Sequence, residues 1–329
     1  MKQRDPFFDN AKFILMVFVI LGHILDIGSK TKTNIVAFEW IFSFHMPLFV
    51  FISGYFTKIT NTNKYWKGIL YFAETLIVFH VIHVIISHIQ GKLINIHELL
   101  IMPKWTLWYL LSLIWWRLIL YYTPSSIRDN HKVLIIISIV LCLIMGWIPI
   151  NSFYSFQRTF AFFPFFIVGF VTGNKNINVK VKGRKIFSLL FLVSIAIIFY
   201  FIPKIDYAIL TQRYCYFQRS LFSPFYYFMF RVVWLVFASC MSYCFLSIIP
   251  LKKYFWTHWG QLTLFIYMYH SVILLWRFVL RDYFHLPTNL FFCFLYSIIV
   301  LGIILIINKV KFFHWLLNPI SSTIKIYKS

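Results

Sequence analysis

The residues best suited to chemistry lie where a membrane segment should carry only apolar side chains. In the stretch DNAKFILMVFVILGHILDIG, which begins at Asp9, Lys12 precedes a long apolar run, and His23 and Asp26 follow it. At about 100° per residue, the side chains of Asp9, Lys12, His23 and Asp26 fall within an arc of roughly 100° on one helix. Histidine can take up and return a proton near neutral pH, and an ionisable group inside a membrane has a desolvation cost that something must offset. The stripe therefore predicts a proton-transfer site on the wall of a helix bundle.

Three residues of this stripe, Lys12, His23 and Asp26, also have a structural interpretation. Lys12 and His23 are separated by about 16 Å along the predicted helix axis. Lys12 could extend its ammonium to the membrane surface, as lysines at helix ends do. His23 could make an interhelical hydrogen bond worth about 1 kcal/mol. Asp26, one turn after His23, could orient the imidazole or serve the structure alone.

A second apolar segment, FEWIFSFHMPLFVFISGYFTK, brings a second histidine into the membrane. His45 is expected about 12 Å below the outer end, near the depth of His23, so the two imidazoles could flank a buried cavity. Pro47 can bend this helix, and Gly54 lets another group approach its backbone closely. Ser53 lies near the inner end.

The composition requires a membrane-embedded bundle to position these groups. Of the 329 residues, 61% are hydrophobic and 12% are charged, and the mean hydropathy is +0.79, which excludes a water-soluble globule. We predict an all-α, polytopic bundle of ten transmembrane helices in a single domain over 1–329, with short tails at 1–9 and 309–329. The first segment is a retained span, because it is too long for a signal peptide and no cleavage site follows it. The ten segments are 10–28, 36–56, 68–89, 105–122, 132–149, 158–173, 185–203, 225–248, 261–280 and 288–308.

The strongly basic charge is explained by topology. The formal net charge is +22, but the cations are scattered between apolar runs, which argues against a nucleic-acid partner. With the N-terminus inside, cations favour the cytoplasmic side by about two to one, so both termini are predicted to be cytoplasmic. The five cysteines show no clustering, and His80 and His83 offer too few ligands for a metal ion. No metal site is predicted.

Five motifs together resemble one enzyme family over nearly the whole chain. They are KFILMVFVILGH, FHMPLFVFISGYF, WTLWYL, RTFAFFPFFIVG and GQLTLFIYMYH. In this order they are similar to the membrane-bound acyltransferase-3 family, and most of all to its fucose 4-O-acetylase-like subgroup. The resemblance implies ten core helices in a bacterial plasma or inner membrane. It also implies transfer of an acetyl group from cytoplasmic acetyl-CoA to a sugar hydroxyl.

The resemblance assigns roles to particular residues. It makes His23 the catalytic histidine and Lys12 its basic partner, and it places Ser53 in the family's Ser-Gly element with Gly54. A pair of basic residues after the second span corresponds to Lys64 and Lys67 in NKYWKG. Here the chain departs from the family, in which arginine is more usual, so bidentate phosphate recognition is lost.

The chemistry of the residues agrees with these roles. Phosphates of acetyl-CoA would stay at a basic cytoplasmic mouth formed by Lys12, Lys64 and Lys67. His23, aided by His45 and Asp26, would remove the proton of an acceptor hydroxyl as it attacks the thioester. We favour this over a covalent acyl-Ser53 intermediate, because nothing places a base beside that serine.

Four further residues are candidates for substrate binding. His270 lies within a span and resembles a recurrent family position, although packing is an equal alternative. Arg158 could hold the acceptor or anchor its helix at the interface. Arg231 lies inside a span and needs a carboxylate, a carbonyl or an anionic substrate. Trp108 could stack on a sugar, or it could belong to an aromatic interface belt.

The predicted function is therefore a transmembrane O-acetyltransferase acting on a cell-surface or lipid-linked glycan, with membrane lipid as its other partner. The rival is a membrane transporter or exporter of a glycan or small polar substrate that uses the same buried groups. Against the rival, the sequence shows no inverted repeat and no matched pair of interrupted helices.

Overall fold

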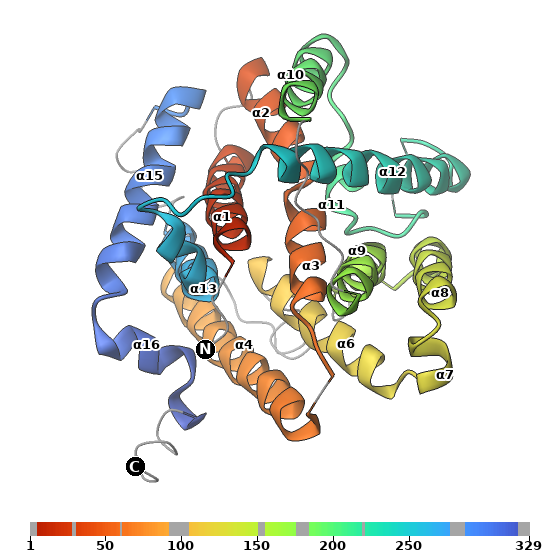
Figure 1. Ribbon diagram of the computed structural model, residues 1–329. Coiled ribbons are helices and arrows are strands. Elements are labelled where there is room, and N and C mark those ends of the chain that lie inside the picture. The colour runs from red at the N-terminus through yellow and green to blue at the C-terminus, as the bar shows by residue number, and fades with distance from the viewer. Residues whose placement is uncertain are drawn as a thin grey trace. The chain divides into compact units, whose positions relative to one another are not determined.

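The computed structural model describes residues 5–27, 31–59, 61–91, 105–150, 155–175, 184–218, 221–276 and 287–321. In these residues the chain forms helices and no strand, which confirms the all-α prediction for this part of the protein (Figure 1). A helix lies in each of the ten predicted segments.

Within the described residues, six helical segments are long and apolar enough to cross a membrane, so the chain is a multi-pass membrane protein. Two shorter apolar helices accompany them, at His131–Trp147 and Lys185–Phe201. The count of ten spans and the cytoplasmic termini remain predictions. The six candidate spans are Pro6–Asp26, Lys32–Tyr55, Thr62–Ile89, Phe156–Asn174, Pro224–Ile248 and Leu290–Ile307.

The chain groups into two compact units, each assembled from three stretches. The first unit comprises Met1–Phe49, Ile177–Leu210 and Val232–Ile306, and the second comprises Val50–Asn176, Thr211–Arg231 and Ile307–Ser329. Each unit contains part of the predicted site. The single domain predicted for 1–329 is not tested by this division.

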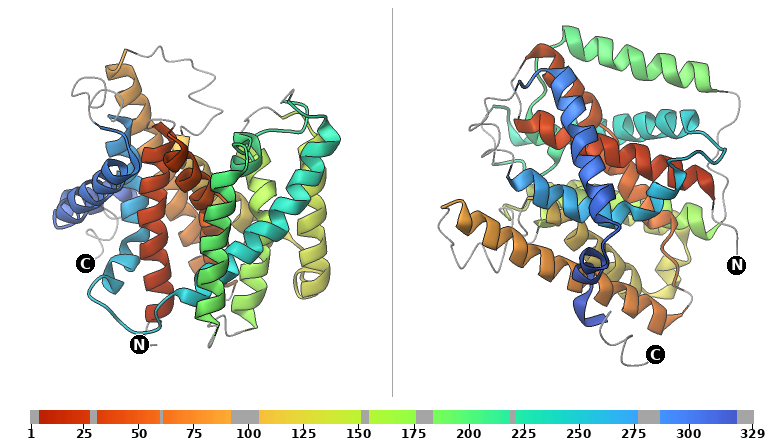
Figure 2. Two further views of the ribbon diagram at one scale, coloured as in Figure 1. Left: turned by 90° about the horizontal axis from the view of Figure 1, so that it is seen from above. Right: turned by 90° about the vertical axis from the view of Figure 1, so that its left-hand side faces the viewer.

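Helix α1 (Pro6–Ile27) is central to the packing of the first unit. It contacts α2 (Lys32–Phe42), the 3-10 helix η4 (Thr257–Leu262) and α13 (Thr263–Leu275), and α2 in turn packs against α10 (Lys185–Phe201), as Figure 2 also shows. Two more helices, α12 (Pro224–Ile248) and α15 (Leu290–Ile307), contribute to this unit, and α11 (Tyr207–Thr211) ends near its boundary. The Trp40 indole donates a hydrogen bond to the Leu192 carbonyl at 2.9 Å, which ties α2 to α10.

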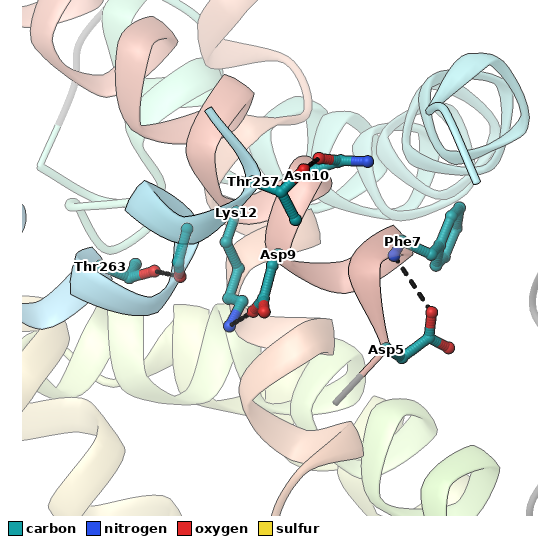
Figure 3. A network of polar contacts seen from close by, with 8 residues as sticks. Asp5, Phe7, Asp9, Asn10, Lys12, Thr257 and Thr263 are labelled. Atoms are coloured by element: carbon teal, nitrogen blue, oxygen red, sulfur yellow. Dashed lines mark hydrogen bonds and ion pairs between the residues drawn. The ribbon is translucent and has the colours of Figure 1, made fainter. Parts of the chain in front are cut away.

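The start of α1 is set by local sequence. Asp5 accepts a hydrogen bond from the Phe7 backbone N–H at 3.1 Å, and Pro6 occupies the first helical position, where its missing N–H costs nothing (Figure 3). Asp9 lies in the first turn, where the helix dipole favours a carboxylate. These signals fix the register that carries Lys12 and His23 along the same helix.

The second candidate span is broken in its interior. Helix α2 ends at Phe42, and α3 (His45–Tyr55) begins after the two turn residues Ser43 and Phe44. The Ser43 hydroxyl donates to the Trp40 carbonyl at 2.7 Å, so the break is compensated inside the protein. Pro47 was expected to bend a continuous helix, but it lies in the first turn of α3, where proline is tolerated.

The second unit is built on four long helices. Helix α6 (Trp108–Tyr122) contacts both α4 (Thr62–Ile89) and α9 (Phe156–Asn174), and α8 (His131–Ile144) packs along α9 (Figure 1). A short helix, α16 (Lys311–Leu317), contacts α4. The described residues of this unit also include the single-turn elements η1 (Trp105–Leu107), α7 (Ser125–Arg128) and η2 (Met145–Trp147).

Glycines allow α3 and α9 to approach within backbone contact. A Cβ on Gly54 would lie 2.0 Å from the Phe166 carbonyl oxygen, and one on Gly169 would lie 2.0 Å from the Phe51 carbonyl oxygen. Gly173, one turn after Gly169, faces the Tyr55 carbonyl in the same way. This is small-residue helix packing of the kind that membrane helices use.

We expect Gly169→Ala to force these helices apart and to lower the melting temperature of the detergent-solubilised protein by several degrees. Gly302→Ala is the matched control, because a Cβ at that helical glycine meets nothing within 4 Å. Alanine favours helix over glycine, so the control should be neutral or slightly stabilising. Equal melting temperatures for the two variants would contradict the close contact.

Candidate active site

The histidine of α1 stacks against a histidine of α13. The ring centroids of His23 and His270 are 5.6 Å apart, with 24° between the ring planes. His270 is fully buried and also contacts the Tyr267 ring at 5.4 Å, whereas His23 is half-buried. Two residues that the sequence nominated separately are therefore neighbours, and the His23 ring is in contact with protein side chains.

His45 is buried and held by the end of α2. Its Nδ1 lies 2.7 Å from the Ile41 carbonyl oxygen. Because a carbonyl can only accept, Nδ1 carries the hydrogen, and Nε2 holds the lone pair in the neutral ring. The Phe42 ring contacts both His45, at 4.7 Å, and His23, at 6.2 Å, which links the two predicted catalytic histidines in one aromatic cluster.

Lys12 forms an ion pair with Asp9, one turn earlier on α1. The Lys12 Nζ lies 2.7 Å from a carboxylate oxygen of Asp9, and the side chains are 14% and 3% exposed respectively (Figure 3). The sequence placed both residues on one stripe but assigned Lys12 to the phosphates of a donor. That role remains a prediction, and any phosphate would share Lys12 with the Asp9 carboxylate.

Sequence reasoning missed the residues that fix this end of α1. Asn10 donates to the Pro250 and Lys252 carbonyls at 2.9 Å each, and it accepts from the Thr257 hydroxyl at 2.7 Å (Figure 3). Gly260 faces the Asp9 carbonyl so closely that a Cβ would lie 1.9 Å from the oxygen. The available signal was an asparagine between Asp9 and Lys12 in a predicted membrane helix.

Asp26, at the other end of α1, lines a small pocket together with Glu39 of α2. Glu39 is buried, and its Oε1 accepts from the Ile205 backbone N–H at 2.8 Å. The sequence nominated Asp26 but not Glu39. A carboxylate within a segment apolar enough to span was the signal that could have found it.

In the second unit, the Ser-Gly element makes contacts of its own. The Ser53 hydroxyl lies 2.5 Å from the Tyr109 hydroxyl, so one donates to the other. Gly54 lies in the α3–α9 glycine contact described above. The roles predicted for both in donor binding remain predictions.

The predicted basic pair lies at the exposed start of α4. Lys64 and Lys67 are both exposed. The buried face of this region includes a guanidinium that the sequence did not nominate. Arg117 of α6 lies over the Phe72 ring at 4.8 Å, and its backbone carbonyl accepts from the Tyr65 hydroxyl at 2.7 Å.

Two predicted substrate-binding residues contact each other. The Arg158 guanidinium of α9 lies 4.8 Å from the centroid of the Trp108 ring of α6. Trp108 is buried and also packs against Phe162 at 5.3 Å. The contact is a cation–π pair, and the substrate-binding roles of both residues remain predictions.

Arg231 is satisfied by hydrogen bonds within the second unit. Its Nε donates to Gln212 at 2.8 Å, and its terminal nitrogens donate to the carbonyls of Cys142, at 3.1 Å, and Tyr214, at 3.3 Å. The guanidinium also lies 4.7 Å from the Tyr216 ring. Burial raises the pKa of the Tyr216 hydroxyl to about 12, an effect that the nearby Arg231 partly offsets. Carbonyl and amide partners therefore account for this buried charge without a substrate.

We expect Arg231→Lys to destabilise the protein, because one ammonium cannot reproduce three divergent donors and leaves buried acceptors unmatched. The melting temperature should fall, and limited proteolysis should cut the loop around Gln212 faster. Arg213→Lys, at an exposed position in the same loop, is the matched control. A stable Arg231→Lys protein with an impaired acceptor KM would instead favour the substrate-binding role.

Comparison with known proteins identifies the family to which the chain belongs. The chain is 28% identical over 131 residues to nodulation protein NolL of Sinorhizobium fredii, which covers 33% of this chain and 34% of that protein. It is 44% identical over 59 residues to nodulation protein NolL of Mesorhizobium japonicum, covering 17% of this chain and 16% of that protein. The chain thus aligns with about a third or less of the length of these relatives, and no solved structure matches it. An acyltransferase domain matches residues 5–308, which confirms the predicted family: the chain belongs to the acyltransferase-3 family of membrane acyltransferases.

Proposed function

We propose that the protein transfers an acetyl group from cytoplasmic acetyl-CoA to a hydroxyl of a cell-surface or lipid-linked glycan, in a bacterial plasma or inner membrane. The observation that carries the proposal is the contact of His23 with His270, on a helix whose opposite end carries Lys12. Membership of the acyltransferase-3 family supports acyl transfer as the reaction. The residues provide a half-buried proton acceptor, His23, and a cation, Lys12, that are separated along one helix.

In this proposal His23 is the general base. Its imidazole takes the proton of the acceptor hydroxyl while that oxygen attacks the thioester carbonyl, so that the new C–O bond forms. The C–S bond then breaks, and the imidazolium returns the proton to the CoA sulfur. His270 stacks on the His23 ring and Phe42 meets it at a right angle, and both would hold its orientation through the cycle.

Lys12 would bind the phosphates of the acetyl-CoA donor at the other end of α1. It lies about 16 Å from His23 along the helix axis, a separation suited to the extended pantetheine arm between the phosphates and the thioester. Lys64 and Lys67, which are both exposed, keep the donor-binding role that the resemblance implies for them. The acceptor would then approach His23 from the end of α1 that carries Asp26.

The test is acetyl transfer by purified protein in proteoliposomes. Radiolabelled acetyl-CoA is supplied with a neutral sugar acceptor, and labelled sugar and free CoA thiol are measured in parallel. Stoichiometric formation of both supports the proposal. Movement of the sugar across the vesicle membrane without release of CoA would overturn it in favour of transport.

A further inference from the structure

A partly open pocket in the first unit lies at the end of α1 opposite Lys12. Its walls come from α1, α2 and the segment that leads into α11, and its polar groups are supplied by Asp26, Asn34, Glu39, Lys204 and Tyr207. None of these except Asp26 was nominated from the sequence. The pocket brings oxygen-rich side chains together beside the helix that carries His23.

Two of the polar side chains are buried and held in place. Glu39 is 1% exposed and accepts from the Ile205 N–H at 2.8 Å. Asn34 is also 1% exposed, and its Nδ2 donates to the Thr288 carbonyl at 2.6 Å. Burying an amide and a carboxylate at this depth is costly unless they serve the structure or a ligand.

The size of the pocket limits what can enter it. Its volume is about 40 Å³, and one water needs about 10–15 Å³ by the same measure. It therefore has room for two or three hydroxyl groups, which is one edge of a sugar ring. The Phe38 and Tyr207 rings, parallel within 11° at 6.1 Å, provide an apolar surface suited to the rest of such a ring.

A short series of ring contacts links the pocket to His23, the proposed general base. Asp26 lies three residues after His23, about 4.5 Å further along the same helix. On the α2 side, the Phe38 ring stacks on Phe42 at 4.0 Å, and Phe42 contacts the His23 ring. A sugar edge held here would place its neighbouring hydroxyls close to His23.

We propose that this pocket is the acceptor subsite, in which Asp26 and Glu39 accept hydrogen bonds from vicinal hydroxyls of an uncharged sugar. The inference rests on the proposed function. Two carboxylates against one exposed lysine give the pocket a negative balance, so it should reject a sugar that carries its own carboxylate at that edge.

Two variants test the pocket in different ways. Glu39→Gln keeps the shape of the side chain and removes its negative charge. Ile35→Phe places a larger side chain in the pocket from its apolar wall. Each should raise the acceptor KM about tenfold or more, with the KM for acetyl-CoA unchanged. Asp206→Asn is the matched control, because that nearby carboxylate does not line the pocket and accepts from the Ala208 N–H instead.

Direct binding separates this inference from the proposed function. Saturation-transfer NMR with methyl α-D-glucopyranoside should show contact with the wild-type protein, reduced in both pocket variants, and weaker contact for the corresponding glucuronide. If binding follows this pattern but no acetyl transfer occurs, the pocket stands and the proposed function fails. If the monodisperse Ile35→Phe protein binds and acetylates the sugar like the wild type, the pocket is not the acceptor subsite. Should Glu39→Gln not fold, Ile35→Phe and Tyr207→Phe decide the question.

Discussion

His23→Ala should lower kcat for acetyl transfer by about 10²–10⁴-fold, the range that a positioned general base contributes. The KM for acetyl-CoA should change little, because the donor phosphates are expected near Lys12, about 16 Å away along α1. The variant should still fold, because His23 is only half-buried and its ring contacts are with Phe42 and His270. The measurement is single-turnover formation of labelled acetyl-sugar in proteoliposomes.

His88→Ala provides the matched control, because this histidine lies at the exposed end of α4. It should retain wild-type turnover.

His45→Ala distinguishes the two predicted catalytic histidines. Its Nδ1–H bond to Ile41 stabilises the break between α2 and α3, so we expect its loss to lower thermal stability together with activity. A stable, inactive His45→Ala protein beside an active His23→Ala protein would reverse their roles.

The sequence predicts the helices well because a membrane imposes one rule on every span. Backbone groups in hydrocarbon must be satisfied internally, so a long apolar run becomes a helix whatever it packs against. The break between α2 and α3 escaped this reasoning. His45 and Ser43 supply local hydrogen bonds to carbonyls near the end of α2, and such compensation depends on side-chain direction rather than hydropathy.

The candidate site was predictable only along a single helix. The 3.6-residue period placed Asp9, Lys12, His23 and Asp26 on one stripe, and the structure shows its first pair in contact. The stacking of His23 on His270 joins segments that are far apart in the sequence, and no local pattern encodes that packing. Glu39 carries a local signal, a carboxylate within an apolar segment, but its place in a pocket with the distant residues Ile205 and Tyr207 is not encoded locally.

The second large effect concerns the ion pair at the start of α1. Lys12→Met should both destabilise the protein and weaken donor binding, because it removes the ammonium that pairs with the Asp9 carboxylate, which is 3% exposed. Removing one partner of a buried pair costs about 3–5 kcal/mol in the free energy of unfolding. Asp9→Asn should do comparable harm, since it leaves the Lys12 ammonium, 14% exposed, without its carboxylate.

The double variant Asp9→Asn/Lys12→Met separates the two roles of the lysine. With both charges gone, the desolvation cost of the stranded ion disappears, so the melting temperature should recover most of the loss seen in either single variant. Donor binding should not recover, because the phosphates would still lack their cation, and the KM for acetyl-CoA should stay raised by about tenfold. Recovery of both properties in the double variant would mean that Lys12 serves only to neutralise Asp9. Lys58→Met, at an exposed position beyond α3, is the control for loss of one cation.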